Sequence, residues 1–323
     1  MPTITFEGKN YDCSDDETLL DSLTRHGVLL PSGCRGGSCH ACLIKAHKGS
    51  PPPLSQSGLK NTLIEQNYFL PCICKPTEDL EIGLASNSTS YQTTLIEKKS
   101  LNETIALLRF AKPKDFEYHP GQFINLLQTE TNVTRSYSLA STPDENFLEL
   151  HVKRVPDGKM SNWLCDVLNV GDEISFFGPS GNCFYMKGDI QQPLVLAGTG
   201  TGLAPLFGIL RDAIHQQHQG EIHIFHASLA AEGLYYTEEL RDISQSHENL
   251  TYIPCVLHGE APEGGLKGSV DQLVVNTIKD GKGIRAYLCG DAPVVDAMQK
   301  SIFFAGASMQ DIYADAFAFT PQG

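Results

Sequence analysis

Residues 31–42 read PSGCRGGSCHAC and carry Cys34, Cys39 and Cys42 in the spacing C-x4-C-x2-C. A fourth cysteine, Cys72, lies in YFLPCICKP, and 29 residues separate it from Cys42. The glycines of the first stretch allow the sharp backbone bends that a single loop needs to wrap a compact metal cluster. The stretch therefore predicts a metal site built from one short loop and one distant thiolate.

This spacing resembles that of the plant-type [2Fe–2S] ferredoxins. The resemblance implies four cluster ligands, Cys34, Cys39, Cys42 and Cys72. Four thiolates also suit zinc, but zinc ligands usually come as paired short knuckles and not as three plus one distant. Cys74 competes with Cys72 for the fourth place, and LPC at this distance favours Cys72 by the family pattern. His40 stands where this family usually has glycine, so the cluster loop departs from the pattern there.

The residues around the loop predict a β-grasp ferredoxin domain over residues 1–88. TITFEGKNYDC, residues 3–13, has the alternating apolar positions of a β-hairpin. DETLLDSLTRHGV, residues 16–28, predicts a capped amphipathic helix that ends at Gly27. The polar segment ASNSTS, residues 85–90, is then a linker to the next domain.

The bulk composition indicates a globular protein of several domains. The 323 residues are 41% apolar and carry a formal charge of −14, which argues against nucleic acid and anionic lipid as partners. The N-terminal residues show no secretion signal, and we expect a cytoplasmic protein without a membrane span. Structural disulfides are disfavoured in that compartment, so ten cysteines with a tight cluster point to a metal or a reaction.

From about residue 91 the pattern changes to short alternating stretches such as TIALLRF, QFINLLQ and FLELHVKRV, separated by turns. They predict an antiparallel β-barrel over residues 89–188. RSYSLAS, residues 135–141, lies between YHPGQF and HVKRVPDGKMSNWL, and GDEISFFGPSGNCF closes the segment. In this order the motifs resemble the flavin domain of the ferredoxin–NADP reductase superfamily.

That resemblance implies a role for each matching residue. Arg135 would pair with the flavin pyrophosphate, Tyr137 would stack on the isoalloxazine ring, and Ser138 would act near its reactive nitrogen. The turn at residues 158–161 would open a helix whose amides face the phosphates. With an N-terminal ferredoxin, members of the superfamily generally use FAD, although FMN also fits. The implied flavin-binding residues are Arg135, Tyr137, Ser138, His151, Lys153, Gly158 and Ser161.

QPLVLAGTGTGLAPLFGIL, residues 192–210, predicts a strand, a glycine-rich turn and a helix, as in a doubly wound α/β domain. The turn is not the G-x-G-x-x-G fingerprint, and a tight turn without a ligand is the alternative. IHIFHASLAAEGLYYTEEL and RAYLCGDAPVVDAM follow in the reductase order, which favours a nucleotide domain over residues 189–323. By resemblance, the nucleotide-binding residues are Gly198, Gly200, Gly202, Cys289 and Gly290, and Phe317 in the final IYADAF is a candidate for an aromatic over the flavin.

The charge pattern bears on the choice between NADH and NADPH. A 2′-phosphate needs a positive partner just after the second strand of such a domain. Residues 226–236, HASLAAEGLYY, contain neither lysine nor arginine. NADH is therefore favoured, although a basic side chain from elsewhere in the fold could bind a 2′-phosphate, and His226 could help.

Together the motifs identify a multidomain α+β and α/β protein that resembles the iron–sulfur flavoprotein reductases of bacterial multicomponent oxygenases. The resemblance implies electron transfer from NADH through FAD to a [2Fe–2S] cluster and on to a redox partner protein, most often a terminal oxygenase. Ser138 and Cys289 are the expected catalytic residues, and the protein is expected to be a monomer. A flavin fits between the other two centres because it can accept an electron pair and release single electrons.

Three other functions share these modules. A reductase for deoxysugar synthesis delivers electrons to a different partner enzyme. The sodium-pumping quinone reductase subunit has an N-terminal membrane helix that we do not expect here. A redox-sensing interaction protein would use slow reductase activity only to set the state of its cluster.

Overall fold

The structure is a computed structural model that describes residues 2–14, 16–30, 35–37, 40, 42–84, 90–128, 131 and 133–317. Cys34 and Cys39 of the predicted cluster lie outside the described residues, as do residues 85–89 of the predicted linker. The chain divides into two compact units, residues 1–88 and 89–323.

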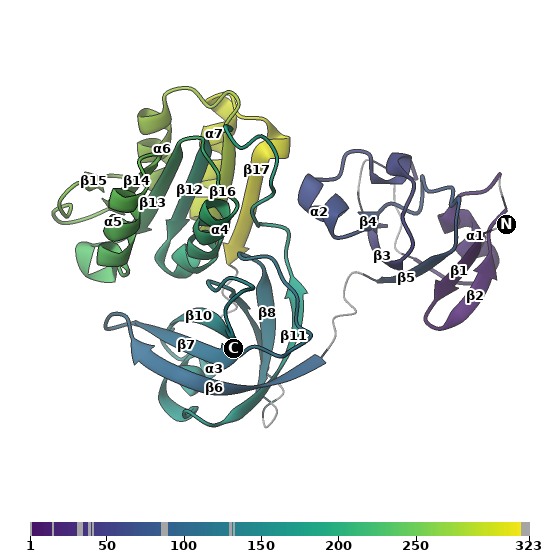
Figure 1. The fold of residues 1–323 in the computed structure, drawn as a ribbon, viewed down its shortest axis with the longest axis horizontal. Helices are drawn as coiled ribbons and strands as arrows, with labels where there is room; N and C mark the ends of the chain where they lie inside the picture. The colour runs from purple at the N-terminus through teal and green to yellow at the C-terminus, as the bar shows by residue number, and fades with distance from the viewer. Residues whose placement is uncertain are drawn as a thin grey trace. The chain divides into compact units, whose positions relative to one another are not determined.

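The first unit is a mixed sheet with helix α1 packed on it (Figure 1). Its strands run in the order β2-β1-β5-β3-β4, with β1 and β5 parallel and the other neighbours antiparallel. This is the predicted ferredoxin fold. The elements are β1 Thr3–Phe6, β2 Lys9–Asp12, α1 Leu19–Arg25, β3 Ile44–Lys48, the 3-10 helix η1 Pro53–Gln56, α2 Asn61–Glu65, β4 Tyr68–Phe69 and β5 Leu80–Leu84.

Local sequence explains the hairpin and the helix, and both predictions are confirmed. Glu7 and Gly8 take φ of 50° and 74°, as a two-residue hairpin turn requires. Thr18 caps α1 by accepting a hydrogen bond of 3.2 Å from the backbone N–H of Asp21. The chain leaves the helix through Gly27, whose φ is 82°.

The second unit begins with an antiparallel barrel. Its sheet runs in the order β10-β7-β6-β11-β8-β9, and a bridge between Leu139 and Leu150 joins its two ends. Gly158 precedes a short helix, as predicted, and a turn of π-helix continues it. The elements are β6 Ser90–Ser100, β7 Ile105–Ala111, β8 Phe123–Gln128, β9 Val133–Ser138, β10 Phe147–Lys153, α3 Lys159–Asn162, the π-helix η2 Trp163–Val167 and β11 Glu173–Ser180.

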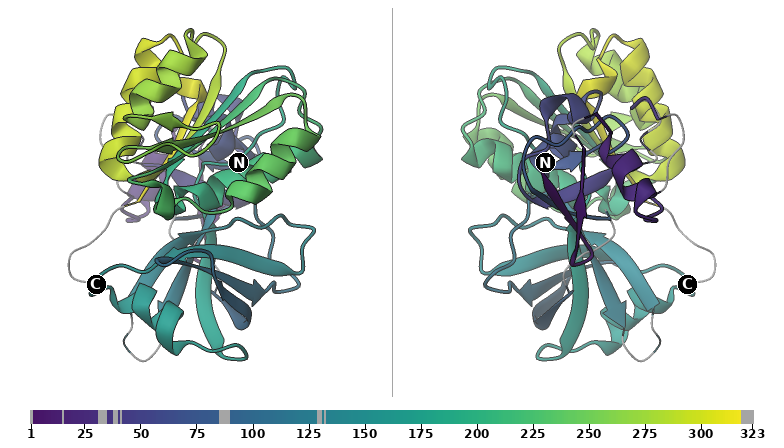
Figure 2. Two further views of the ribbon diagram at one scale, coloured as in Figure 1. Left: turned by 90° about the vertical axis from the view of Figure 1, so that its left-hand side faces the viewer. Right: turned by 90° about the vertical axis from the view of Figure 1, so that its right-hand side faces the viewer.

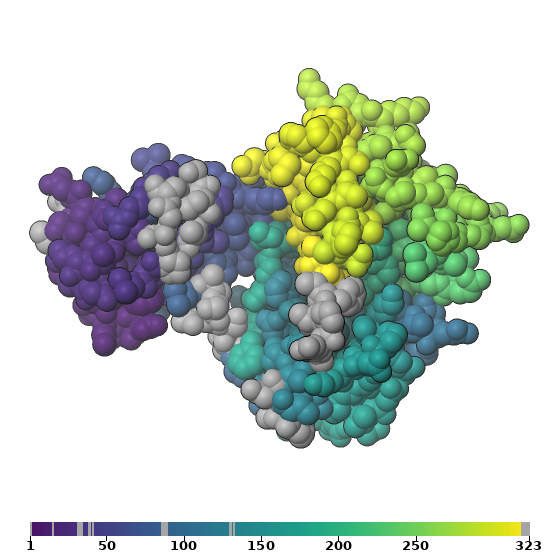
Figure 3. Space-filling model, turned by 180° about the vertical axis from the view of Figure 1, so that it is seen from behind, coloured from purple at the N-terminus to yellow at the C-terminus, as the bar shows by residue number. Residues whose placement is uncertain are grey.

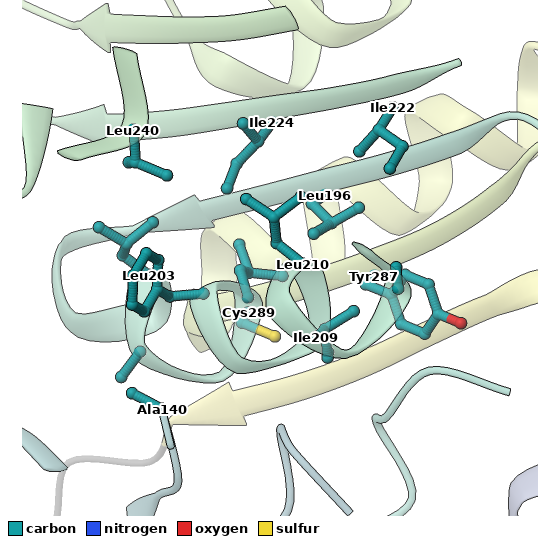
Figure 4. Packing of buried hydrophobic residues seen from close by; sticks show 14 of the residues in the cluster. Ala140, Leu196, Leu203, Ile209, Leu210, Ile222, Ile224, Leu240, Tyr287 and Cys289 are labelled. Atoms are coloured by element: carbon teal, nitrogen blue, oxygen red, sulfur yellow. The ribbon is translucent and has the colours of Figure 1, made fainter. Parts of the chain in front are cut away.

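The rest of this unit is a parallel sheet in the order β15-β14-β13-β12-β16-β17. Helices cover both of its faces, with α6 and α7 on one side and α4 and α5 on the other (Figure 2). Figure 4 shows Leu203, Ile209 and Leu210 of α4 against the sheet. The elements are β12 Leu194–Thr199, the 3-10 helix η3 Gly200–Gly202, α4 Leu203–His215, β13 Ile222–Ser228, the 3-10 helix η4 Ala231–Gly233, α5 Thr237–Ser246, β14 Leu250–Val256, β15 Leu266–Lys267, α6 Val270–Ile278, β16 Arg285–Asp291, α7 Ala292–Phe304, the 3-10 helix η5 Met309–Asp311 and β17 Ile312–Phe317.

The carboxyl ends of the strands of the parallel sheet face the barrel. The arrowheads of β13 and β17 run toward the barrel in Figure 1, and α7 and β17 lie on one outer face of this unit in Figure 3. Ligands of doubly wound sheets bind at the carboxyl ends of the strands, so this edge is where a dinucleotide would meet the barrel. No helix within the described ranges is both long and apolar enough to cross a membrane.

Candidate active site

The site forms where the end of β9 meets the carboxyl ends of β16 and β17. Ser138 is the last residue of β9, and its hydroxyl donates a hydrogen bond of 3.0 Å to Oδ2 of Asp315 on β17. Asp315 pairs in register with Cys289 on the neighbouring strand β16. Ser138 and Cys289, which the sequence separates by 150 residues, are thus gathered around one carboxyl group.

Burial sets the protonation of this group of side chains. It raises the pKa of Asp315 to about 6, while the hydrogen bond from Ser138 acts in the opposite direction. Burial also raises the pKa of Cys289 well above its ordinary value, and the nearby Cys183 thiol adds to the shift. The two sulfur atoms lie 3.8 Å apart. Cys289 is therefore a neutral thiol at physiological pH, whereas Asp315 can hold or release a proton close to neutrality.

Strand β9 presents two of the predicted flavin residues, Arg135 and Tyr137, on one face, and Ser138 is on the other. Val133, Arg135 and Tyr137 alternate with Thr134 and Ser136, and the first three are the half-buried members. The Arg135 guanidinium donates to the backbone carbonyl of Thr134 at 2.8 Å. Burial raises the pKa of Tyr137, so its phenol stays protonated. This strand offers a flat ring and a cation two residues apart, which suits a flavin ring and its phosphates.

The turn before α3 is narrow. A side chain at position 158 would meet the hydroxyl of Ser161, which accepts a hydrogen bond of 3.2 Å from the backbone N–H of Val155. Asn162 follows, and its side-chain oxygen is buried without a hydrogen-bond partner among the described residues. The oxygen and nitrogen of an asparagine side chain are told apart only by their hydrogen-bond partners. If the Asn162 amide is rotated by half a turn, its NH2 group takes the place of the oxygen and could donate to a bound phosphate. The turn thus fits the nucleotide part of a flavin.

His151 and Lys153 lie on β10 but differ in setting. Lys153 is exposed. His151 is buried, and both of its ring nitrogens have protein partners, Tyr235 and Glu149. A contact between His151 and a cofactor would therefore have to use its main chain.

The three glycines of the turn at residues 198–202 have two different roles. A Cβ at position 202 would overlap the main chain of Cys289, and a Cβ at position 198 would lie 2.7 Å from Leu206. Gly200 has φ of 54° and faces open space. Gly198 and Gly202 therefore allow the turn to pack, while Gly200 exposes backbone to a ligand.

Gly290 and Phe317 complete the edge of the sheet. Gly290 has φ of 124°, and a Cβ there would lie 2.8 Å from the backbone oxygen of Thr199, at the end of β12. Phe317 is half-buried at the end of β17, two residues after Asp315 and hence on the same side of the strand. Both residues lie at the end of the sheet that faces the barrel.

The described part of the cluster loop lies against the segment that carries Cys72. Cys42 and Cys72 are both buried. A Cβ at Gly37, whose φ is 82°, would lie 2.8 Å from Ile73, so the loop lies against the segment that carries Cys72. Two buried thiols on adjoining segments fit the predicted [2Fe–2S] site.

The backbone conformation of His40 and the burial of Cys74 bear on the sequence-based assignment of the cluster site. His40 has φ of 53°, the left-handed region that favours glycine, which explains why glycine is usual at this position in the ferredoxin family. Cys74 is fully buried, and burial raises the pKa of its thiol to about 12, while Ser55 acts weakly against the shift.

His226 does not offer a charge to a 2′-phosphate. It is fully buried, and burial lowers its pKa to about 3, with a further lowering by His151. The ring is therefore neutral at physiological pH. His226, the candidate for phosphate binding in residues 226–236, therefore carries no charge that could bind a 2′-phosphate.

Sequence reasoning missed the role of Asp315. The motif IYADAF contains it, but the resemblance points to Phe317, the aromatic two residues later. A carboxylate is ordinary in an exposed strand, and only the pairing of β17 with β16 places it beside Cys289. The available signal was an acidic residue in an otherwise apolar final strand.

Comparisons with known proteins agree with the three-part order. Residues 3–77 match the 2Fe-2S iron-sulfur cluster binding domain, residues 92–185 the oxidoreductase FAD-binding domain, and residues 196–300 the oxidoreductase NAD-binding domain. The reductase subunit of an aromatic O-demethylase from Amycolatopsis sp. is 30% identical over 97% of this chain and 98% of its own. The electron transfer component of toluate 1,2-dioxygenase from Pseudomonas putida is 30% identical over 95% and 94%. The crystal structure of the cytochrome P450 reductase GcoB from Amycolatopsis has a TM-score of 0.70 and 27% identity, over 98% of this chain and 99% of its own.

The chain belongs to the iron–sulfur flavoprotein reductases of the ferredoxin–NADP reductase superfamily. It is an NAD(P)H-dependent oxidoreductase with domains for a [2Fe–2S] cluster, FAD and a nicotinamide dinucleotide. The predicted fold class, cofactor classes and enzyme class are confirmed.

Proposed function

We propose that this protein takes electrons from NADH and delivers them, through FAD and a [2Fe–2S] cluster, to a partner protein. When bound, FAD supplies the exchange between the electron pair of a hydride and the single electrons that the cluster accepts. The observation that carries the proposal is the contact between Ser138 and Asp315, because it joins the flavin barrel to the nucleotide sheet at the predicted site of hydride transfer. We take residues 1–88, 89–188 and 189–323 as the three domains.

The cluster is assigned to four cysteines. Burial of Cys42 and Cys72 on adjoining segments supports the choice. The left-handed backbone at Gly37 and His40 fits a tightly bent loop. The proposed ligands are Cys34, Cys39, Cys42 and Cys72.

On the barrel, Arg135 holds the pyrophosphate, Tyr137 covers the flavin ring, and Ser138 orients its reactive edge. The half-buried face of β9 supports the roles of Arg135 and Tyr137, and the hydrogen bond to Asp315 supports that of Ser138. His151 contributes through its main chain and Lys153 through its exposed cation. The proposed flavin-binding residues are Arg135, Tyr137, Ser138, His151, Lys153, Gly158, Ser161 and Phe317.

In the parallel sheet, Gly200 presents backbone to the dinucleotide, and Gly198 and Gly202 let the turn pack. Cys289 and Gly290 lie beside the nicotinamide, where the neutral thiol excludes water. Asp315 accepts the Ser138 hydroxyl at Oδ2 and can hold or release a proton at its other oxygen near neutrality, since burial brings its pKa to about 6. These residues position the reactants, while the redox chemistry belongs to the cofactors.

NADH is the preferred donor. A 2′-phosphate would find no lysine or arginine in residues 226–236, and His226 is buried and neutral. FAD is preferred over FMN because the matching flavin domain is an FAD-binding one.

The partner is a terminal oxygenase. The printed names of several relatives support this, among them the electron transfer component of toluate 1,2-dioxygenase and that of a xylene/toluene monooxygenase. We propose a cytoplasmic monomer that meets this partner through the loop of residues 34–42. Sedimentation of the holoenzyme tests the oligomeric state, and a dimer would contradict it.

Steady-state turnover with a one-electron acceptor tests the proposed donor and rate. We expect kcat/KM for NADH to exceed that for NADPH by at least tenfold, because a hydrogen-bonded phosphate partner is worth about this factor. A preference for NADPH would overturn the donor. Turnover that stays slow at saturating NADH would favour a redox sensor over a reductase.

A further inference from the structure

A buried polar network crosses from the barrel to the nucleotide sheet through the side chain of His151, whose main chain alone is assigned to flavin binding. On the barrel, Glu149 and His151 are neighbours on one face of β10, and both are buried. On the other side, Tyr235 and Tyr236 follow β13 and precede α5. The Tyr235 hydroxyl lies 3.0 Å from Nδ1 of His151, and the Tyr236 hydroxyl donates to Oε1 of Glu149 at 3.2 Å.

The hydrogen bonds of this network have one consistent direction. Nε2 of His151 lies 3.1 Å from Oε1 of Glu149, and an ionised carboxylate can only accept, so Nε2 carries the hydrogen. Nδ1 of a neutral ring is then an acceptor and receives the Tyr235 hydroxyl. The chain runs from Tyr235 through His151 to Glu149, with every member partnered.

Glu149 stays ionised inside this network. Burial opposes its charge, but the hydrogen bonds from His151 and Arg109 and the charge of Arg109 outweigh burial and lower its pKa to about 2. Arg109 donates from Nε to Oε2 of Glu149 at 2.7 Å. A charged acceptor in a water-poor setting strengthens each hydrogen bond that it receives.

The network holds the nucleotide-binding end of the sheet from two sides. Strand β10 lies against η3, the glycine-rich turn, and through Tyr235 and Tyr236 it also holds the loop after β13. Tyr236 has φ of 53°, a conformation that a bulky residue keeps only where its surroundings fix it. Its ring also lies 5.1 Å from that of Phe207 on α4.

We infer that Tyr235 and Tyr236 are positioning residues for hydride transfer, because their hydroxyl groups fix the nucleotide sheet against the flavin barrel. They do not touch the reacting atoms. Hydride transfer requires donor and acceptor within about 3.5 Å and aligned, and small misplacements cost large factors in rate. This inference rests on the proposed transfer from NADH to FAD.

The test is anaerobic stopped-flow reduction of the holoenzyme by NADH, normalised to bound FAD. For Tyr235→Phe and Tyr236→Phe we expect the limiting rate of flavin bleaching to fall by about tenfold and the Kd for NADH to change by less than about threefold. The charge-transfer absorbance between nicotinamide and flavin should weaken in parallel. Tyr252→Phe is the matched control, because its hydroxyl lies 3.5 Å from Nδ1 of His226 within the same sheet and does not reach the barrel.

Each outcome bears on the inference separately from the proposed function. Wild-type limiting rates in both variants, or an equal loss in Tyr252→Phe, would overturn the positioning role. If Tyr235→Phe does not retain FAD, Tyr236→Phe alone decides, since its side chain is only partly buried. A wild-type enzyme that NADH does not bleach would instead overturn the proposed function.

Discussion

Ser138 on β9 donates its hydroxyl hydrogen to Asp315 on β17, so one hydrogen bond of 3.0 Å connects the barrel with the parallel sheet. The contact joins residues that are 177 positions apart. It places a titratable group where a flavin and a nicotinamide would meet in the proposed site, so we expect pH to act on the site through Asp315.

We predict that the limiting rate of flavin reduction falls as pH rises through about 6. Burial raises the pKa of Asp315 to about 6, and an ionised Asp315 places a negative charge where hydride delivery adds another. Asp315→Asn should remove this step from the pH profile. Stopped-flow rates between pH 5 and 8 check it, and an unchanged profile in the variant would assign the step to another group.

The same carboxyl group affects stability. An acid whose pKa is higher in the folded protein destabilises it above that pKa and has no effect below its unfolded pKa of about 3.9. Asp315→Asn should therefore raise the free energy of unfolding by about 1 kcal/mol at pH 8, after allowance for partial exposure. The gain should shrink as pH falls from 6 toward 4, as urea titrations of the apoprotein would measure.

The choice between Cys72 and Cys74 is testable by paired substitutions. Cys72→Ser should abolish the [2Fe–2S] absorbance, because the cluster loses a thiolate. Cys74→Ser should retain the cluster but lower stability by about 1–3 kcal/mol, because it buries a hydroxyl in the core. Loss of the cluster in Cys74→Ser, with retention in Cys72→Ser, would reverse the assignment.

His40→Gly should stabilise the cluster loop. A non-glycine residue at φ of 53° costs about 1 kcal/mol, and glycine removes that cost. We expect slower loss of cluster absorbance on heating. Gly37→Ala is the matched opposite, since its Cβ would press on Ile73 at a φ of 82°, and it should speed the loss. Equal rates in the two variants would contradict this account of the loop.

A positively charged side chain introduced just after β13 should improve the binding of NADPH. Leu229 directly follows β13 and its side chain is exposed, so Leu229→Arg places a guanidinium near a 2′-phosphate without burying it. The KM for NADPH should fall by about tenfold and that for NADH should hardly change. Val170→Arg, an exposed site on the barrel, is the control. No gain with NADPH would show that the 2′-phosphate binds elsewhere.

Docking of the partner is tested at Arg35. Its Nη1 lies 2.9 Å from Oδ1 of Asp21, and both side chains are about half exposed, so the pair contributes little to stability. Arg35→Glu should raise the KM for the partner protein while leaving reduction of ferricyanide unchanged. Lys9→Glu, on the hairpin, adds the same charge as a control. Unchanged transfer in Arg35→Glu would exclude docking at this loop.

The sequence was sufficient for features that depend on local pattern. The hairpin at residues 3–13, the helix ending at Gly27 and the strand, turn and helix around Gly200 follow from alternation, capping and glycine placement. The domain order follows from motifs in series. In each case the deciding residues are close together in the chain.

Features that depend on pairing between distant strands could not be predicted. Asp315 lies beside Cys289 only because β17 pairs with β16, and Tyr235 meets His151 only where the parallel sheet contacts the barrel. Burial also changed chemistry that the sequence left open. His226 had appeared able to help bind a phosphate, and its complete burial keeps it neutral.

The most direct test is an anaerobic titration of the purified holoenzyme with NADH, followed by absorbance and electron paramagnetic resonance. The account predicts that NADH bleaches the flavin and that the signal of a reduced [2Fe–2S] cluster then appears. A flavin that bleaches without any cluster signal would contradict the proposed path from NADH to a partner protein.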